Sequence, residues 1–74
     1  MDKDLHLMLK TSAEADIAKA KLTFRLLNDK AVGVGEHSTQ DFYDNAEEAL
    51  SKMADALDRL EALEVIRQEL RGRG

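Results

Sequence analysis

The chain has 74 residues, no cysteine, no proline and a formal net charge of −4. A chain of this length forms one small domain, and the absence of cysteine excludes disulfides and thiolate metal sites as sources of stability. Ala, Leu, Glu, Lys, Arg and Asp dominate the composition, which favours helices over strands. We therefore expect a single all-α domain over residues 1–74 that gains stability by oligomerisation.

The negative charge belongs to the second half of the chain. Residues 1–37 carry six basic and six acidic side chains, whereas residues 38–74 carry five basic and nine acidic ones. Binding to a phosphate backbone needs clustered Lys and Arg, so this balance argues against a nucleic-acid partner. No apolar run approaches the ~20 residues that span a bilayer, and the Leu5–Leu9 cluster is too short for a signal peptide. We expect a cytoplasmic protein with no membrane partner.

The first element is expected to be a helix over about residues 4–31. Leu5, Met8 and Leu9 have helical spacing and favour this long helix. A capping box at Thr11 and Glu14 suits the alternative, a later start with a loose arm before it. An apolar seam recurs at alternating spacings of four and three residues, which predicts packing against one neighbouring helix. Its members are Ala13, Ile17, Ala20, Phe24, Leu27 and Ala31.

A second apolar row lies on nearly the opposite face of this predicted helix. It consists of Ala15, Ala18, Leu22 and Leu26. A helix that packs against one neighbour needs only one apolar face. We interpret the row as a contact with a second copy of the chain, and the alternative is a groove for a partner helix.

Residues 32–37 are expected to form the turn between two helices. Gly33 is placed to cap the first helix, Gly35 lets the chain reverse, and Ser38 is placed to cap the second helix. The glycines also invite comparison with a phosphate-binding loop, but no strand precedes them and no Lys follows. His37 with nearby carboxylates invites comparison with a metal site, yet a capping turn before a solvated acidic face explains the same residues. No metal or cofactor is expected.

The second helix is expected over about residues 39–71. Acidic residues crowd its start and basic residues its end, which matches the helix dipole. Two pairs of opposite charge stand four residues apart in the favourable order, Glu48 with Lys52 and Asp55 with Arg59. The predicted apolar seam of this helix consists of Phe42, Ala46, Leu50, Met53, Leu57, Leu60 and Leu63.

Two long helices joined by a short turn predict an antiparallel two-helix hairpin. Each helix buries one seam against the other, and a wide apolar groove remains between them. A second copy of the chain would close this groove. We therefore expect a homodimer that forms a four-helix bundle.

The sequence shows no constellation of catalytic residues. There is no cysteine nucleophile, the serines stand at capping or surface positions, and the two histidines are far apart in the chain. We expect a non-enzymatic interaction or adaptor protein that acts by helix–helix docking, with itself and a partner helix as its contacts. One alternative is a small regulator that binds nucleic acid through Arg67, Arg71 and Arg73. Another is a purely structural subunit that assembles only with itself.

The predicted turn also carries a resemblance. Residues 32–38 are Val-Gly-Val-Gly-Glu-His-Ser, and an acidic helix with Ala-Leu and Leu-Glu-Ala-Leu repeats follows them. Over residues 32–63 the chain resembles small uncharacterised helical proteins of T4-like marine phages, in which a Gly-x-Gly-Glu/Asp-His turn joins two helices. The resemblance implies a phage accessory factor without a known activity, and it implies no site residues.

Overall fold

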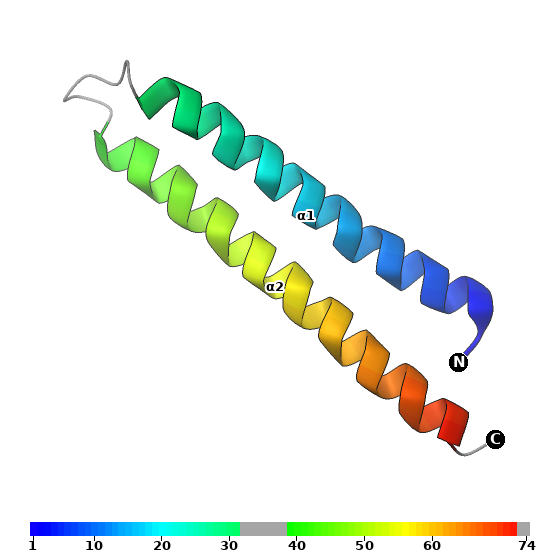
Figure 1. Cartoon of the computed structure of the whole chain (residues 1–74). Helices are drawn as coiled ribbons and strands as arrows, with labels where there is room; N and C mark the ends of the chain where they lie inside the picture. Colours follow the sequence, from blue (N-terminus) through cyan, green and yellow to red (C-terminus); the bar gives the residue numbers. More distant parts are fainter. Residues whose placement is uncertain (32–38, 73–74) are drawn as a thin grey trace.

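The computed structural model describes residues 1–31 and 39–72 of the chain. This part consists of two helices, α1 over Lys3–Ala31 and α2 over Thr39–Gly72. The helices run antiparallel and side by side, so that both ends of the chain lie at one end of a rod (Figure 1). The Cα atoms extend over 58 × 16 × 12 Å. The all-α class and the hairpin are confirmed, and each helix begins and ends within one residue of its expected bounds.

Asp2 explains why α1 starts so early. Its Oδ1 accepts a hydrogen bond of 2.9 Å from the backbone N–H of Leu5, which is a contact typical of an N-cap. The backbone N–H of His6 donates to the Asp2 carbonyl at 2.9 Å and begins the helical ladder. The helix continues through Thr11, so the alternative of a later start with a loose arm is wrong.

The two helices meet along a seam of small side chains. The buried apolar residues of the described chain are Ala13, Ala20, Ala49, Ala56 and Leu63, and no large side chain among the described residues is fully buried. The buried residues recur at seven-residue intervals on each helix, which is the heptad repeat of a coiled coil. Because the distance between packed helices depends on the side chains at their contact, alanine allows α1 and α2 to approach closely.

Larger apolar side chains flank this alanine seam and are half-buried. They occupy predicted seam positions of both helices, namely Ile17, Phe24 and Leu27 on α1 and Phe42, Met53 and Leu60 on α2. The predicted seam residue Ala46 is half-buried as well. The hairpin by itself therefore does not enclose a core of large side chains.

Two residues that we predicted in the α2 seam lie outside it. Leu50 is 59% exposed and Leu57 is 50% exposed, whereas Ala49 and Ala56 are buried. The alternation of four and three residues along α2 passes through these two alanines, and the prediction wrongly chose the larger neighbour at both places. Leucine is the more apolar residue, but only alanine fits between helices that already meet through the alanines of α1.

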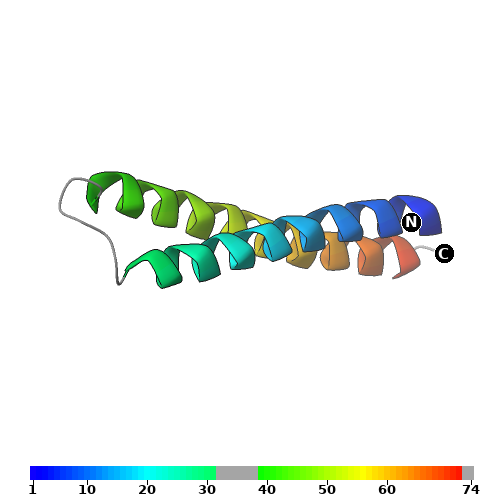
Figure 2. The same ribbon diagram turned by 90° about the horizontal axis from the view of Figure 1, so that it is seen from above.

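The two helices also wind around each other. Seen from above, they cross near the middle of the rod (Figure 2), as helices with heptad seams do. The predicted turn and its caps, Gly33, Gly35 and Ser38, lie outside the described residues, as does His37. Within the described ranges, neither helix combines the length and the apolar character that crossing a membrane requires.

Candidate interaction surfaces

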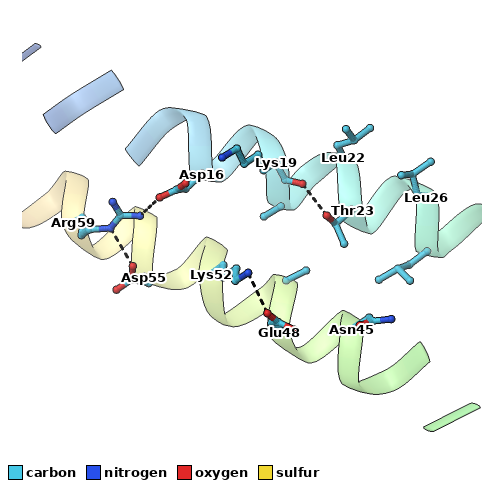
Figure 3. Close-up of a pocket in the computed structure, with 13 residues that line it drawn as sticks. Asp16, Lys19, Leu22, Thr23, Leu26, Asn45, Glu48, Lys52, Asp55 and Arg59 are labelled. Atoms are coloured by element: carbon cyan, nitrogen blue, oxygen red, sulfur yellow. Dashed lines mark hydrogen bonds and ion pairs between the residues drawn. The ribbon is translucent and has the colours of Figure 1, made fainter. Parts of the chain in front are cut away.

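One ion pair connects the two helices and shows which of their residues lie level. The Nη2 group of Arg59 donates a hydrogen bond of 2.5 Å to Asp16 Oδ2 on α1 (Figure 3). The Nε group of Arg59 donates to Asp55 Oδ2 at 3.0 Å, one turn earlier on α2. The helices are antiparallel, so counting forward from Asp16 on α1 corresponds to counting backward from Arg59 on α2. Residues at equal counts from these two lie level with each other.

This contact shifts the proton affinity of both partners. The hydrogen bond from Arg59 lowers the pKa of the Asp16 carboxyl below its ordinary value of 3.8, and the same bond raises the pKa of Arg59. Both groups are therefore charged at neutral pH. Since both side chains remain in contact with solvent, the pair adds little stability, and it marks the register in which the helices pack.

A groove of about 790 Å³ lies beside the ion pair, between the two helices. Its lining includes the seam residues Ala20, Leu27 and Ala49, and its rims are polar and charged. One rim holds the predicted pair of Lys52 and Glu48, whose Nζ and Oε1 atoms are 3.1 Å apart (Figure 3). Both predicted pairs on α2 are thus confirmed. We call this hollow the ion-pair groove.

The predicted interface row borders the ion-pair groove. Leu22 and Leu26 line its outer edge, are 51% and 53% exposed, and project from α1 away from α2 (Figure 3). Ala15 and Ala18, the other two members of the row, are exposed as well. The hairpin therefore leaves the whole predicted row accessible.

A second apolar surface lies on the other side of the hairpin. Tyr43, Leu50 and Leu57 follow one another at seven-residue intervals on α2 and are at least half exposed. Leu50 and Leu57 each stand two residues before a groove residue, Lys52 or Arg59. Two residues correspond to about 200° around a helix, so the leucines and the groove residues flank the seam on opposite sides. We call the surface of Tyr43, Leu50 and Leu57 the leucine face.

The leucine face was not predicted from the sequence, although a signal was present. Each residue of the face directly follows a seam residue, namely Phe42, Ala49 or Ala56. This gives α2 three apolar positions in each heptad instead of two. Such a wide stripe is typical of a helix that contacts more than one neighbour.

The basic residues near the end of α2 lie among acidic neighbours. The Nη2 group of Arg67 donates to Glu64 Oε1 at 3.4 Å, and the Gln68 amide donates to the same oxygen at 3.2 Å. The hydrogen bond from Gln68, assisted by Arg67, lowers the pKa of the Glu64 carboxyl. Arg71 stands in the last turn of α2, and Arg73 lies outside the described residues. The described part of this tip presents charges of both signs.

A smaller hollow of about 310 Å³ lies near the same end of the rod. Lys10, Glu14, Glu64 and Arg67 contribute to its lining, together with His6. Within residues 1–31 and 39–72, no group of three or more His, Asp or Glu side chains is placed to bind a metal ion. The ion-pair groove and the leucine face offer apolar contact area beside charged side chains.

Comparison with known protein families, with curated proteins and with solved structures finds no match to this chain. Its function is therefore inferred from its own surfaces. These are the ion-pair groove with its row of Leu22 and Leu26, and the leucine face.

Proposed function

We propose that this protein is a small non-enzymatic interaction protein, an adaptor that acts by docking a helix of another protein. The observation that supports this function is the distribution of its apolar side chains. Among the described residues, four of the five buried apolar ones are alanines, whereas Leu22, Leu26, Leu50 and Leu57 keep at least half of their surface exposed. Exposed apolar patches with polar rims are typical of protein interaction sites.

The ion-pair groove suits an amphipathic helix as its occupant. Two packed helices leave a channel between them, into which a ridge of side chains from a third helix packs. Leu22 and Leu26 stand one helical turn apart, about 6 Å along α1, and match the i, i+4 anchors of such a ridge. The rims carry both signs of charge, for example Lys19 and Glu48, and would set the direction of the bound helix.

Self-association belongs to the same proposed function. A hairpin of this size has too small a core to be very stable alone, and a second copy would complete a four-helix bundle. A phage accessory role follows from the resemblance of residues 32–63 and stays a prediction, as does a cytoplasmic location. No observation on the described residues favours the nucleic-acid alternative, since Arg67 is paired with Glu64.

A capture experiment tests the adaptor function. The tagged chain is added to an extract of the cells in which it is made, and the retained proteins are compared with those retained by Leu22→Glu/Leu26→Glu. We expect the double substitution to reduce capture of a specific protein about tenfold or more, because two half-exposed leucines become charged. Val65→Glu is the control, since Val65 is 56% exposed and belongs to neither apolar surface, and circular dichroism verifies that each variant is helical.

Three results would contradict the adaptor function or its assignment to the ion-pair groove. Enrichment of nothing but the chain itself would support the purely structural subunit. Equal capture by the wild type and by Leu22→Glu/Leu26→Glu would place docking outside the ion-pair groove. Retained nucleic acid that is released steeply as salt increases would support the regulator instead.

A further inference from the structure

We propose that a second copy of this chain covers the leucine face, oriented so that the two copies share the same end of the rod. This inference rests on the proposed docking function and names the partner of one of its surfaces. The ion-pair groove and the row of Leu22 and Leu26 stay outside this dimer and remain free for another protein.

The leucine face is continuous with the interior of the hairpin. Met53 and Leu60 follow Leu50 and Leu57 by three residues, so each half-buried side chain lies beside an exposed leucine on the same side of α2. A partner that covers the two leucines also buries the open sides of Met53 and Leu60. Covering this face therefore converts a two-helix contact into a closed four-helix core.

The dimensions of the rod favour a second copy as the partner. One broad side of the hairpin measures 58 × 16 Å, which corresponds to roughly 900 Å². A stable interface of standard size buries about 800 Å² on each partner. A second hairpin has the same length and the same face, whereas a single helix would cover only part of the width.

Charges along the borders of the leucine face favour one pairing of helices. On α2, Glu47 precedes Leu50 by three residues and Glu61 follows Leu57 by four, so both carboxylates border the leucines. On α1, Lys21 and Arg25 border the leucines, and Glu14 lies on the same side nearer the chain ends. Lys21 precedes Thr23 by two residues, and Arg25 follows it by two. Thr23 lines the ion-pair groove, and two residues correspond to about 200° around a helix. Both basic side chains therefore lie on the other side of α1, toward the leucine face.

These border charges are available to a partner. Within the part of the chain that the structure describes, the ion pairs do not include Lys21, Arg25, Glu47 or Glu61. In a two-fold dimer that places α1 of each copy on α2 of the other, Lys21 and Arg25 of one copy lie between the levels of Glu47 and Glu61 of the second copy, which is a favourable arrangement of charge.

The charged hollow near the chain ends favours one orientation of the second copy along the rod. Glu64 follows Leu57 by seven residues and continues the same side of α2 into the charged hollow near the chain ends. A reversed copy that covers the whole rod would place its Leu50 level with Glu61 and its Tyr43 level with Gln68, beside this hollow, and would remove the charges of Lys10 and Glu14 from water. A copy that shares the same end places Leu50 and Leu57 of both copies at the same height along the rod, away from this hollow.

Substitutions at two leucines that are equally exposed in the hairpin test the proposed dimer interface. Leu57 on the leucine face and Leu22 on the opposite surface are 50% and 51% exposed, so an isolated hairpin tolerates a charge equally at both positions. In sedimentation equilibrium at micromolar concentration, we expect the wild type to have about twice the 8.3 kDa chain mass. Leu57→Glu should weaken the dimer at least tenfold, whereas Leu22→Glu should leave it unchanged.

Two outcomes of this measurement would overturn the proposal. Dissociation by Leu22→Glu but not by Leu57→Glu would move the dimer contact to the α1 row. A wild type that sediments as a folded monomer would exclude the second copy as partner. The adaptor function would survive the second outcome, because the capture experiment measures docking of a different protein.

A distance measurement tests the orientation even where Leu57→Glu prevents folding. The chain has no cysteine, so Gln40→Cys provides a single site for a spin label on the exposed first turn of α2. In the proposed dimer, pulsed electron paramagnetic resonance should give a distance of about two to three helix diameters, on the order of 20–30 Å. A distance that approaches the 58 Å length of the rod would overturn the orientation. Ser51→Cys, nearer the middle of α2, is the control, with a short distance in either orientation.

Discussion

A larger apolar residue in the middle of the alanine seam should destabilise the hairpin. Ala56 is completely buried. The Asp16–Arg59 contact places it level with Ala20 on α1, which is also buried. The substitution Ala56→Leu adds three carbon atoms at the point where the two helices approach through alanines. Either the helices separate or the leucine adopts a strained rotamer.

The expected loss of unfolding free energy is about 1–3 kcal/mol, the usual cost of overpacking a close-packed site. The difference in helix propensity between alanine and leucine is only a few tenths of a kcal/mol and does not decide the result. A change of ~1 kcal/mol shifts the melting temperature of a domain of this size by roughly 4–8 °C. We therefore expect Ala56→Leu to melt about 4–24 °C below the wild type.

The assay is thermal and urea unfolding followed by far-ultraviolet circular dichroism. All proteins are compared at one concentration, because self-association makes the midpoint depend on concentration. Ala62→Leu is the control, since it makes the same change at an exposed position of α2. If Ala56→Leu were as stable as Ala62→Leu, the alanine seam would not be the contact between the helices. A more stable Ala56→Leu would show that the seam has room for a larger side chain at this position.

Three further predictions concern charged and capping residues. Asp16→Asn should flatten the pH dependence of stability below about pH 4. The pKa of Asp16 is lower in the folded protein than in the unfolded chain, so its carboxylate stabilises the fold at pH values above the unfolded-state pKa. This stability is lost as the pH falls through the folded-state pKa. Urea midpoints between pH 2 and pH 7 measure this, and parallel curves for variant and wild type would contradict it. Asp2→Ala removes the N-cap of α1 and should cost ~0.5–2 kcal/mol of local stability. Faster hydrogen exchange of the Leu5 amide is the expected signal, and unchanged protection would show that Asp2 does not cap the helix. Glu48→Gln breaks the exposed pair with Lys52 and should cost at most ~0.5 kcal/mol in the same unfolding assay. A larger loss would indicate that this pair supports the groove.

The candidate surfaces were only partly predictable from the pattern of residues. The row of Leu22 and Leu26 was predictable, because a second apolar line on a helix is visible in its periodicity alone. The leucine face was visible only as a widened apolar stripe on the second helix. Leu50 and Leu57 are next to Ala49 and Ala56, and either choice satisfies a helical period, so the pattern does not show which residue of each pair is exposed. We predicted the leucines in the seam because leucine is more apolar than alanine. In the packed hairpin the smaller alanine is buried instead, because the space between the helices is narrow.

The contact between Asp16 and Arg59 beside the ion-pair groove could not be predicted from the sequence either. Asp16 and Arg59 are far apart in the chain, and each also has charged neighbours on its own helix. The i, i+4 pair of Asp55 and Arg59 was predictable because both of its members lie on one helix. The contact across the hairpin depends on the register between helices, which local periodicity does not specify.

By itself, the sequence determines two helices, their bounds and the exposed charged pairs on α2. These features depend on spacing, capping and propensity within a few residues, and they form in the same way whatever the helix later contacts. Only the tertiary structure decides which side of α2 faces α1. Ala13 and Ala20 let the helices approach so closely that alanine, not leucine, must fill the facing positions. Leu50 and Leu57 therefore lie outside the seam and form the leucine face, which we propose that a second copy covers.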